Sequence, residues 1–155
     1  MTFEQAVRET PDVSSAYCPG LQAIRRCDRT HMDCPDTSVL AGSINLDEAV
    51  ETLYPSDPRW DYGIGLVVNQ RDDRVIWVEV HPASTSNVGE MLRKRDWLRA
   101  WLKTSAPKVR RLQCHAFYWV ASGRIAISRN SPQARRLAES GMRFPTKHLK
   151  IDRST

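Results

Sequence analysis

The strongest constraint on the fold is a pair of apolar runs separated by a short polar turn. DYGIGLVV, residues 61–68, alternates in side-chain character, and VIWVEV, residues 75–80, follows after the segment NQRDDR. Two such runs joined by a polar turn predict a β-hairpin. Strand side chains alternate between the two faces of a sheet, so matching the apolar faces fixes the register of this hairpin.

The predicted register places three polar side chains, Asp61, Glu79 and His81, on one face of the hairpin. On the same face Gly63 and Gly65 leave a shallow hollow that a ligand could approach. Two converging carboxylates repel each other unless a cation or a proton lies between them, and hard oxygen ligands suit Mg²⁺ or Mn²⁺. An imidazole beside them could be a third ligand or carry a proton.

A purely structural interpretation of these three residues stays open. In that interpretation Asp61 is an exposed turn residue at the start of the strand. Glu79 then pairs with an arginine, and His81 caps the next helix.

The remaining patterns predict helices on both sides of the hairpin and a second hairpin after it. The expected helices cover residues 3–9, 43–53, 84–103 and 131–140, and the expected second hairpin joins strands 112–121 and 124–128 through the turn Ser122–Gly123–Arg124. Residues 142–151 suggest an edge strand. This order predicts an α/β (α+β) fold with a mixed central sheet flanked by helices.

The length of 155 residues favours a single domain, 1–155. Residues 1–42 are expected to form an irregular, partly helical N-terminal segment, and residues 43–155 the core. No apolar run approaches the roughly 18 to 20 residues of a membrane span, and the N-terminus lacks the pattern of a secretory signal. We therefore expect a cytoplasmic protein without membrane contact.

Charge is distributed unevenly along the chain. Residues 1–82 carry 7 Lys/Arg against 14 Asp/Glu, a net −7, whereas residues 83–155 carry 16 against 4, a net +12. A segregated basic surface attracts a polyanion, so nucleic acid is the first partner to consider. The side chains expected to contact its phosphate backbone are Arg93, Arg95, Lys103, Lys108, Arg110 and Arg111.

Two other interpretations of this charge pattern stay open. The arginine-rich helices could simply be solvated faces. The acidic half of one copy could also dock on the basic half of another and give a homodimer.

A second candidate metal site lies in the segment CPGLQAIRRCDRTHMDC. Cys18, Cys27, His31 and Cys34 are enough ligands for one tetrahedral Zn²⁺, although the spacing lacks the usual paired-cysteine knuckle. Reduced thiols without a metal are the alternative. Cys114 and His115 are neighbours in a predicted strand, so they should point to opposite faces and form no catalytic pair.

The segments WDYGIG and WVEVHP resemble the motif of the PD-(D/E)xK nuclease superfamily, and the resemblance covers about residues 43–145. It implies a restriction-endonuclease-like core with Asp61 and Glu79 as ligands for Mg²⁺ or Mn²⁺. His81 stands where this superfamily usually has lysine, and Trp60 where proline precedes the aspartate. Some members place the lysine on the following helix, where Lys94 is the candidate.

The resemblance implies metal-dependent hydrolysis of phosphodiester bonds in nucleic acid, with Asp61, Glu79, His81 and Lys94 as catalytic residues. A carboxylate from Glu48 or Glu51 on the preceding helix could join them. The alternative is a catalytically inactive binding or assembly module that kept the fold and lost the motif lysine.

Overall fold

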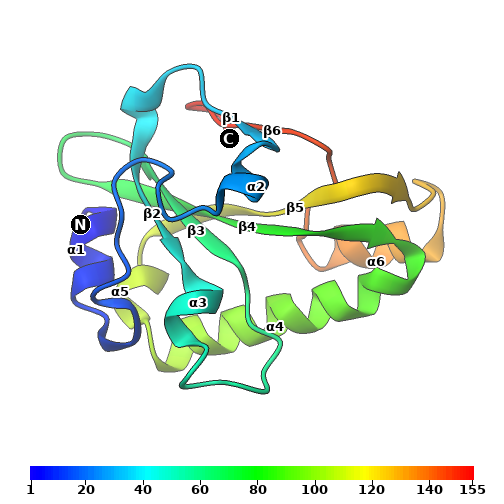
Figure 1. Cartoon of the computed structure of the whole chain (residues 1–155), viewed down its shortest axis with the longest axis horizontal. Helices are drawn as coiled ribbons and strands as arrows, with labels where there is room; N and C mark the ends of the chain where they lie inside the picture. The colour runs from blue at the N-terminus through cyan, green and yellow to red at the C-terminus, as the bar shows by residue number, and fades with distance from the viewer.

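A four-stranded mixed sheet forms the centre of the computed structural model, which describes all 155 residues except the side chain of His115 (Figure 1). The expected absence of a Cys114–His115 pair therefore lies outside the described residues. The strands of this sheet are β2 (Leu40–Asn45), β3 (Tyr62–Val67), β4 (Asp73–Ser84) and β5 (Gln113–Ala126). Their order is β2-β3-β4-β5, with β4 and β5 parallel and the other pairs antiparallel.

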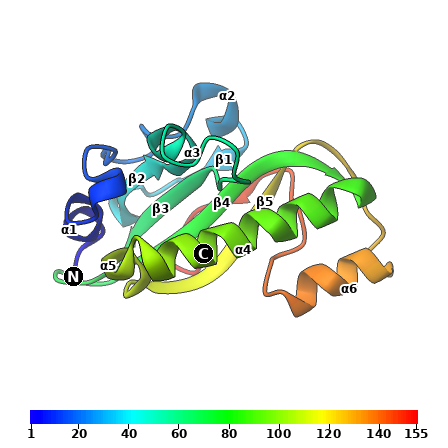
Figure 2. The same cartoon turned by 90° about the horizontal axis from the view of Figure 1, so that it is seen from below.

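The long α4 runs along the sheet, and α6 lies beneath α4 (Figure 2). A two-stranded sheet of β1 and β6 covers the other side. The remaining elements are α1 (Phe3–Arg8), α2 (Arg26–Arg29), α3 (Leu46–Val50), α4 (Val88–Thr104), α5 (Pro107–Arg110), α6 (Pro132–Glu139), β1 (Met32–Asp33), β6 (Leu149–Lys150) and the 3₁₀ turns η1 (Pro11–Val13), η2 (Thr37–Val39) and η3 (Thr85–Asn87).

The predicted hairpin is confirmed in its strands and in its register. Tyr62 pairs with Val78, and Gly63 pairs with Trp77. Alternation then divides the core between the two faces of the sheet. The face that carries Trp77 packs against α1, α4 and α6, and the opposite face packs against the β1–β6 side. The expected α/β class with a mixed sheet is confirmed as well.

Residues 43–53 are not one helix, contrary to the prediction. Ser43 and Ile44 belong to β2 and pair with β3, and α3 begins only at Leu46. The side chain of Asn45 accepts a hydrogen bond from Glu48 N, so the helix cap lies two residues later than expected. β2 therefore crosses the expected boundary at residue 42.

The predicted second hairpin is also wrong, because β5 continues through Ser122–Arg124. His81 pairs with Ala121 and Ala83 with Ile125, so one residue of β4 lies opposite three of β5. The segment SGR thus forms a bulge rather than a turn. The last helix was predicted correctly: Ser131 caps α6, and Gly141 follows it with a φ of +79°.

The segment after α6 adds only isolated pairings to the edge of β5, where an edge strand was expected. Phe117 bridges Met142 and Val120 bridges Thr146 before the chain crosses to β1 as β6. These bridges and their hydrogen bonds still cover part of the exposed edge of β5.

The expected hollow beside Gly63 and Gly65 is filled by the protein itself. A Cβ atom at Gly63 would lie 2.7 Å from the Trp77 ring, and one at Gly65 would lie 2.3 Å from Phe3. Both glycines serve close packing, because α1 inserts Phe3 against β3. The alternation of side chains along β3 predicted an open space beside Gly65, but it could not show that Phe3, which is distant in the sequence, fills this space.

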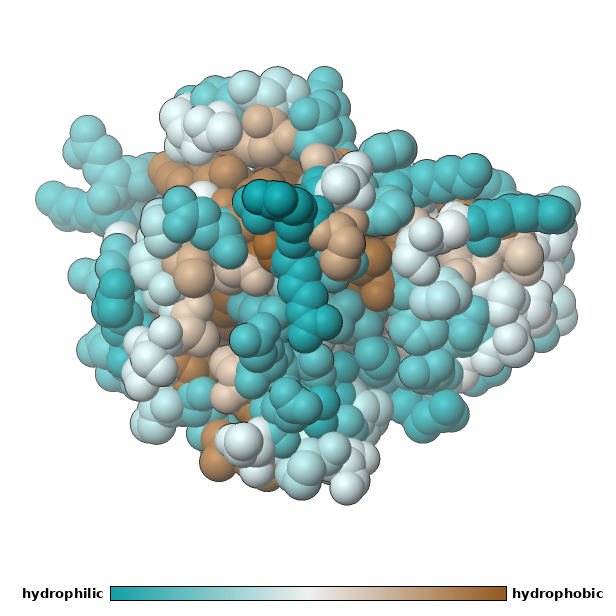
Figure 3. All heavy atoms as spheres, in the orientation of Figure 1, coloured by the Kyte–Doolittle hydropathy of each residue, from teal (hydrophilic) through white to brown (hydrophobic). Residues whose placement is uncertain are grey.

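The surface in the view of Figure 3 is mostly hydrophilic, with hydrophobic residues in small patches between polar side chains. Within the described residues, no helix combines the length and the hydropathy that crossing a bilayer requires.

Candidate active site

The start of β3 is held against β4 by two reciprocal contacts between backbone and carboxylate. Asp61 N donates to Glu79 Oε1 at 2.9 Å, and Val80 N donates to Asp61 Oδ2 at 3.1 Å. The carbonyl of Asp61 accepts hydrogen bonds from Leu46 N and Asp47 N, which joins this point to α3. Two carboxylates therefore meet where three elements converge.

Lys94 extends from α4 to complete this group. Its Nζ donates to Glu79 Oε2 at 2.7 Å. The Glu79 side chain is only 1% exposed and that of Lys94 is 16% exposed, so the ion pair is largely removed from water. We refer to Asp61, Glu79 and Lys94 as the carboxylate–lysine cluster.

Burial and the charge of Asp61 raise the pKa of Glu79 well above its ordinary value, against the opposing influence of Lys94. Burial also raises the pKa of Asp61, and a hydrogen bond between the two carboxyl groups favours the proton on Glu79. For Lys94, burial alone would lower the pKa, but the attraction of Glu79, Asp61 and Glu90 together outweighs it and the net shift is upward. The lysine therefore stays cationic, and both carboxyl groups hold a proton more readily than ordinary carboxyl groups do.

His81 does not join the carboxylate–lysine cluster. Its Nε2 lies 3.3 Å from Glu90 Oε2 on α4, and its Nδ1 lies 2.9 Å from the carbonyl of Pro82. No hydrogen bond joins its ring to either carboxylate within the described residues. The strand alternation placed His81 on the correct face, but the contact with α4 turns it toward a different partner.

Two acidic residues near the cluster were missed by sequence reasoning. Asp47, at the start of α3, is close enough for its charge to raise the pKa of Asp61, and it forms an ion pair with Arg59 at 2.8 Å. Glu90 lies one turn before Lys94 and raises its pKa. The four-residue spacing of Glu90 and Lys94 was the available sequence signal for the second of these.

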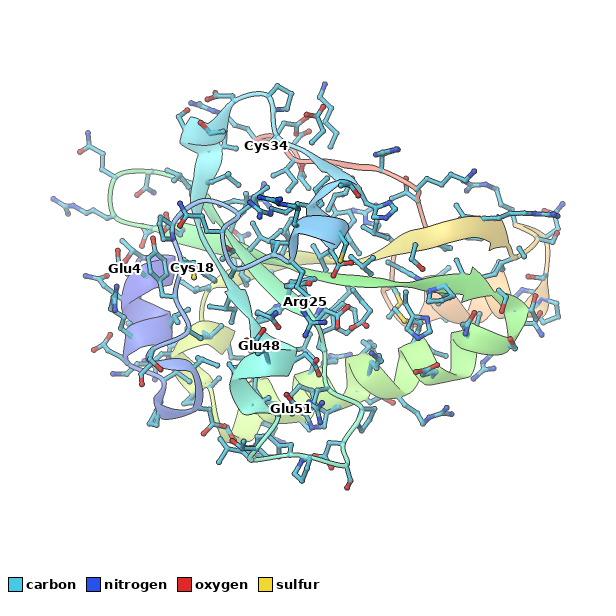
Figure 4. All side chains as sticks on the ribbon, viewed as in Figure 1. Glu4, Cys18, Arg25, Cys34, Glu48 and Glu51 are labelled. Carbon is cyan, nitrogen blue, oxygen red and sulfur yellow. The ribbon has the colours of Figure 1, made fainter. Side chains whose placement is uncertain are left out.

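Glu48 and Glu51, the carboxylates proposed from sequence, do not reach the cluster. Glu48 accepts a hydrogen bond from Nδ2 of Asn45, the residue that caps α3. Figure 4 shows Glu51 at the far end of α3 from the sheet. The residue of α3 that lies near the cluster is Asp47 in its first turn, because α3 begins later than predicted.

The predicted zinc ligands are not brought together. Cys18 pairs with Ser43 beside β2, whereas Cys34 packs against the core cluster of the β1–β6 side and lies well above Cys18 in Figure 4. Among the described residues, no three His, Cys, Asp or Glu side chains converge closely enough to hold a metal ion. Cys27, His31 and their neighbours are placed by α2 and β1 rather than by a shared ligand.

The basic residues expected to form one phosphate track are divided among different places. Arg95, Lys103 and Arg110 line a common pocket, whereas Arg111 lines another. Lys108 forms an ion pair with Glu9 at 3.2 Å, and Arg93 is exposed on α4. Helix periodicity and the packing of α5 separate residues that are close in sequence.

No protein-family model, curated protein or solved structure matches this chain.

Proposed function

We propose that this protein is a metal-dependent nuclease whose centre is the carboxylate–lysine cluster. The observation that carries the proposal is the convergence of Asp61 from just before β3, Glu79 from β4 and Lys94 from α4. The lysine arrives from the helix after Glu79, as the resemblance to PD-(D/E)xK nucleases implies. Nucleic acid as substrate is supported by the net +12 of residues 83–155.

The chemistry of the two carboxyl groups suits a divalent cation. They share a buried site in which burial and the charge of Asp61 raise the pKa of Glu79, and Mg²⁺ or Mn²⁺ would offset the repulsion between the two carboxylates. Asp61 and Glu79 are the residues that would hold it. When bound, such an ion would lower the pKa of a coordinated water and neutralise charge on the phosphate.

The other side chains then have separate roles. Lys94 fixes the Glu79 carboxylate through Oε2 and, being cationic, supplies positive charge beside the phosphate. Its raised pKa makes it a poor general base. The proposal assigns His81 no contact with the carboxylates, because its Nε2 faces Glu90.

The second candidate is the inactive binding or assembly module, and a specific observation favours it. Both Glu79 oxygens already accept hydrogen bonds, and the side chain is 1% exposed. In this case the cluster ties β3, β4 and α4 together, and nucleic acid is bound elsewhere without cleavage.

Cleavage assays with Mg²⁺ or Mn²⁺ separate the two candidates, using single- and double-stranded DNA and RNA. We expect cleavage by the wild type that chelation abolishes and that Glu79→Gln removes. Arg136→Gln, an exposed change on α6, is the matched control and should cleave normally. Cleavage that persists in Glu79→Gln would contradict the assignment of this cluster as a nuclease centre. Binding of nucleic acid without cleavage by the wild type and both variants would favour the inactive binding or assembly module.

A further inference from the structure

A pocket of about 690 Å³ lies between α4, α5, β5 and the end of α6. Two of the elements that line it are α4 and α6, and α6 runs beneath α4 (Figure 2). Arg95, Arg99 and Lys103 line it from α4, and Arg110 from α5. Asp61, Glu79 and Lys94 do not line it, so it is a separate site, which we call the basic pocket.

The positive charge of the basic pocket is largely uncompensated within the chain. In the described part of the protein, Arg99, Lys103 and Arg110 form no ion pair and no side-chain hydrogen bond. Arg95 pairs only with its exposed neighbour Asp96. Glu139 is the one carboxylate among the lining residues, which leaves a net charge of about +3 from four cations and one anion.

Arg95 also has an unmet hydrogen-bonding group. Its side chain is 16% exposed, and its Nε is buried with no partner among the described residues. A buried N–H without an acceptor is unfavourable, so an acceptor supplied by a ligand would relieve it. The oxygens of a phosphate group are acceptors of this kind, and guanidinium groups bind them in a bidentate manner.

One wall of the pocket is apolar. Leu102 and Phe117 contribute to it, and the Phe117 ring is half-buried against Trp60. A pocket that combines an aromatic wall with converging cations suits a ligand that carries both a planar ring and an anionic group. The volume is within the range of small-molecule sites.

We propose that the basic pocket binds one nucleotide, with its phosphate on the cations and its base against the Phe117 wall. The choice of a nucleotide rests on the proposed function, but binding here requires no hydrolysis. The nucleotide can be free or one unit of a strand, and the two sources share the same recognition chemistry.

Alkylation of Cys114 reports occupancy, because this cysteine lines the pocket. Burial raises the pKa of its thiol, so labelling with iodoacetamide is run under mildly alkaline conditions. Cys27 is exposed elsewhere and serves as the internal reference. Mass spectrometry of the full chain then measures labelling of each cysteine with AMP, with a short oligonucleotide or with inorganic phosphate.

We expect AMP or the oligonucleotide to slow labelling of Cys114 and to leave Cys27 unchanged. Stronger protection by AMP assigns a free nucleotide, and stronger protection by the oligonucleotide assigns a unit of a strand. No protection by either would overturn the proposal. Protection by inorganic phosphate equal to that by AMP would overturn the assignment of a base to the apolar wall.

The variant pair Arg99→Gln with Lys103→Gln tests the cations. We expect it to weaken nucleotide binding by about tenfold or more in calorimetry, because two charge-assisted hydrogen bonds are lost. The exposed pair Arg136→Gln with Lys147→Gln removes the same charge outside the pocket and should change affinity by no more than about twofold. Equal losses in the two pairs would mean that only net charge matters and would contradict a built site.

Failure of this proposal can be told apart from failure of the nuclease assignment. Glu79→Gln should still show protection of Cys114 by the nucleotide, since Glu79 does not line the pocket. If no cleavage is detected but the nucleotide still protects Cys114, only the nuclease assignment fails. If cleavage is detected but Cys114 is not protected, only the proposal of a nucleotide in the basic pocket fails.

Discussion

Adjacent residues of α4 serve two regions of opposite electrostatic character. Lys94 enters the carboxylate–lysine cluster, in which its charge is offset by Glu79 at 2.7 Å. Arg95 lines the basic pocket, in which the neighbouring cations have no partner in the described chain. Compensated charge inside the protein contributes to stability and site geometry, whereas uncompensated charge in a pocket indicates a partner from outside.

The largest expected contrast is in stability when one lysine or arginine is removed from each region. Lys94→Met should destabilise the fold by about 3 kcal/mol or more, because it leaves two buried carboxylates without their cation. Arg99→Met should change the free energy of unfolding by less than about 0.5 kcal/mol. Urea denaturation measures both, and similar losses would break the comparison.

Divalent cations should stabilise the cluster and leave the basic pocket unaffected. At 100 times the dissociation constant, Mn²⁺ should raise the free energy of unfolding of the wild type by about 2.7 kcal/mol. Thermal melts at increasing Mn²⁺ concentration measure this effect. Glu79→Gln should show no such increase, whereas Arg99→Gln should respond as the wild type does.

The carboxylate–lysine cluster should make the free energy of unfolding depend on pH, because the pKa of Glu79 is raised. The pKa of Glu79 is raised, so the folded state holds a proton that the unfolded chain releases near 4.5. The resulting stabilisation is full below that value and is lost as pH rises toward the folded pKa, by at most about 1.4 kcal/mol per pH unit.

Denaturation curves of the wild type and Glu79→Gln, compared at each pH, isolate this contribution. We expect the wild type to lose stability relative to the variant as pH rises above 4.5. A constant difference across the pH range would mean that Glu79 is ionised in the folded protein like an ordinary carboxylate.

The smallest expected effect concerns repulsion within the basic pocket. Lys103→Gln removes one of four neighbouring cations and should stabilise the ligand-free protein by at most about 0.5 kcal/mol. The gain should shrink as salt is added, because screening weakens repulsion between accessible charges. Denaturation at low and high ionic strength tests both statements.

The sequence was most informative where local periodicity decides the structure. Alternation along β3 and β4 was sufficient to place Asp61 and Glu79 together, whereas Lys94 became a candidate partner only through the resemblance to PD-(D/E)xK nucleases. It failed where distant segments meet. Nothing local to Gly65 reveals that Phe3 fills the space beside it.

The basic pocket shows the same limit for the candidate sites. Arg95, Lys103 and Arg110 were recognised as cations, but Arg99 was missed and the pocket itself was not foreseen. Its shape depends on how α6 packs beneath α4, a contact between segments about 40 residues apart. Charge in a sequence therefore identifies candidates, and tertiary packing decides which of them act together.

The bulge at Ser122–Arg124 has a consequence for how this chain can change length. It adds two residues to β5 relative to β4, and an even number preserves the alternation of inward and outward side chains. Trp119 and Ala121 before it and Ile127 after it thus stay in the same core cluster. Insertions or deletions of two residues here should be tolerated far better than those of one. A change of one residue would exchange the inward-facing and outward-facing side chains at the end of β5.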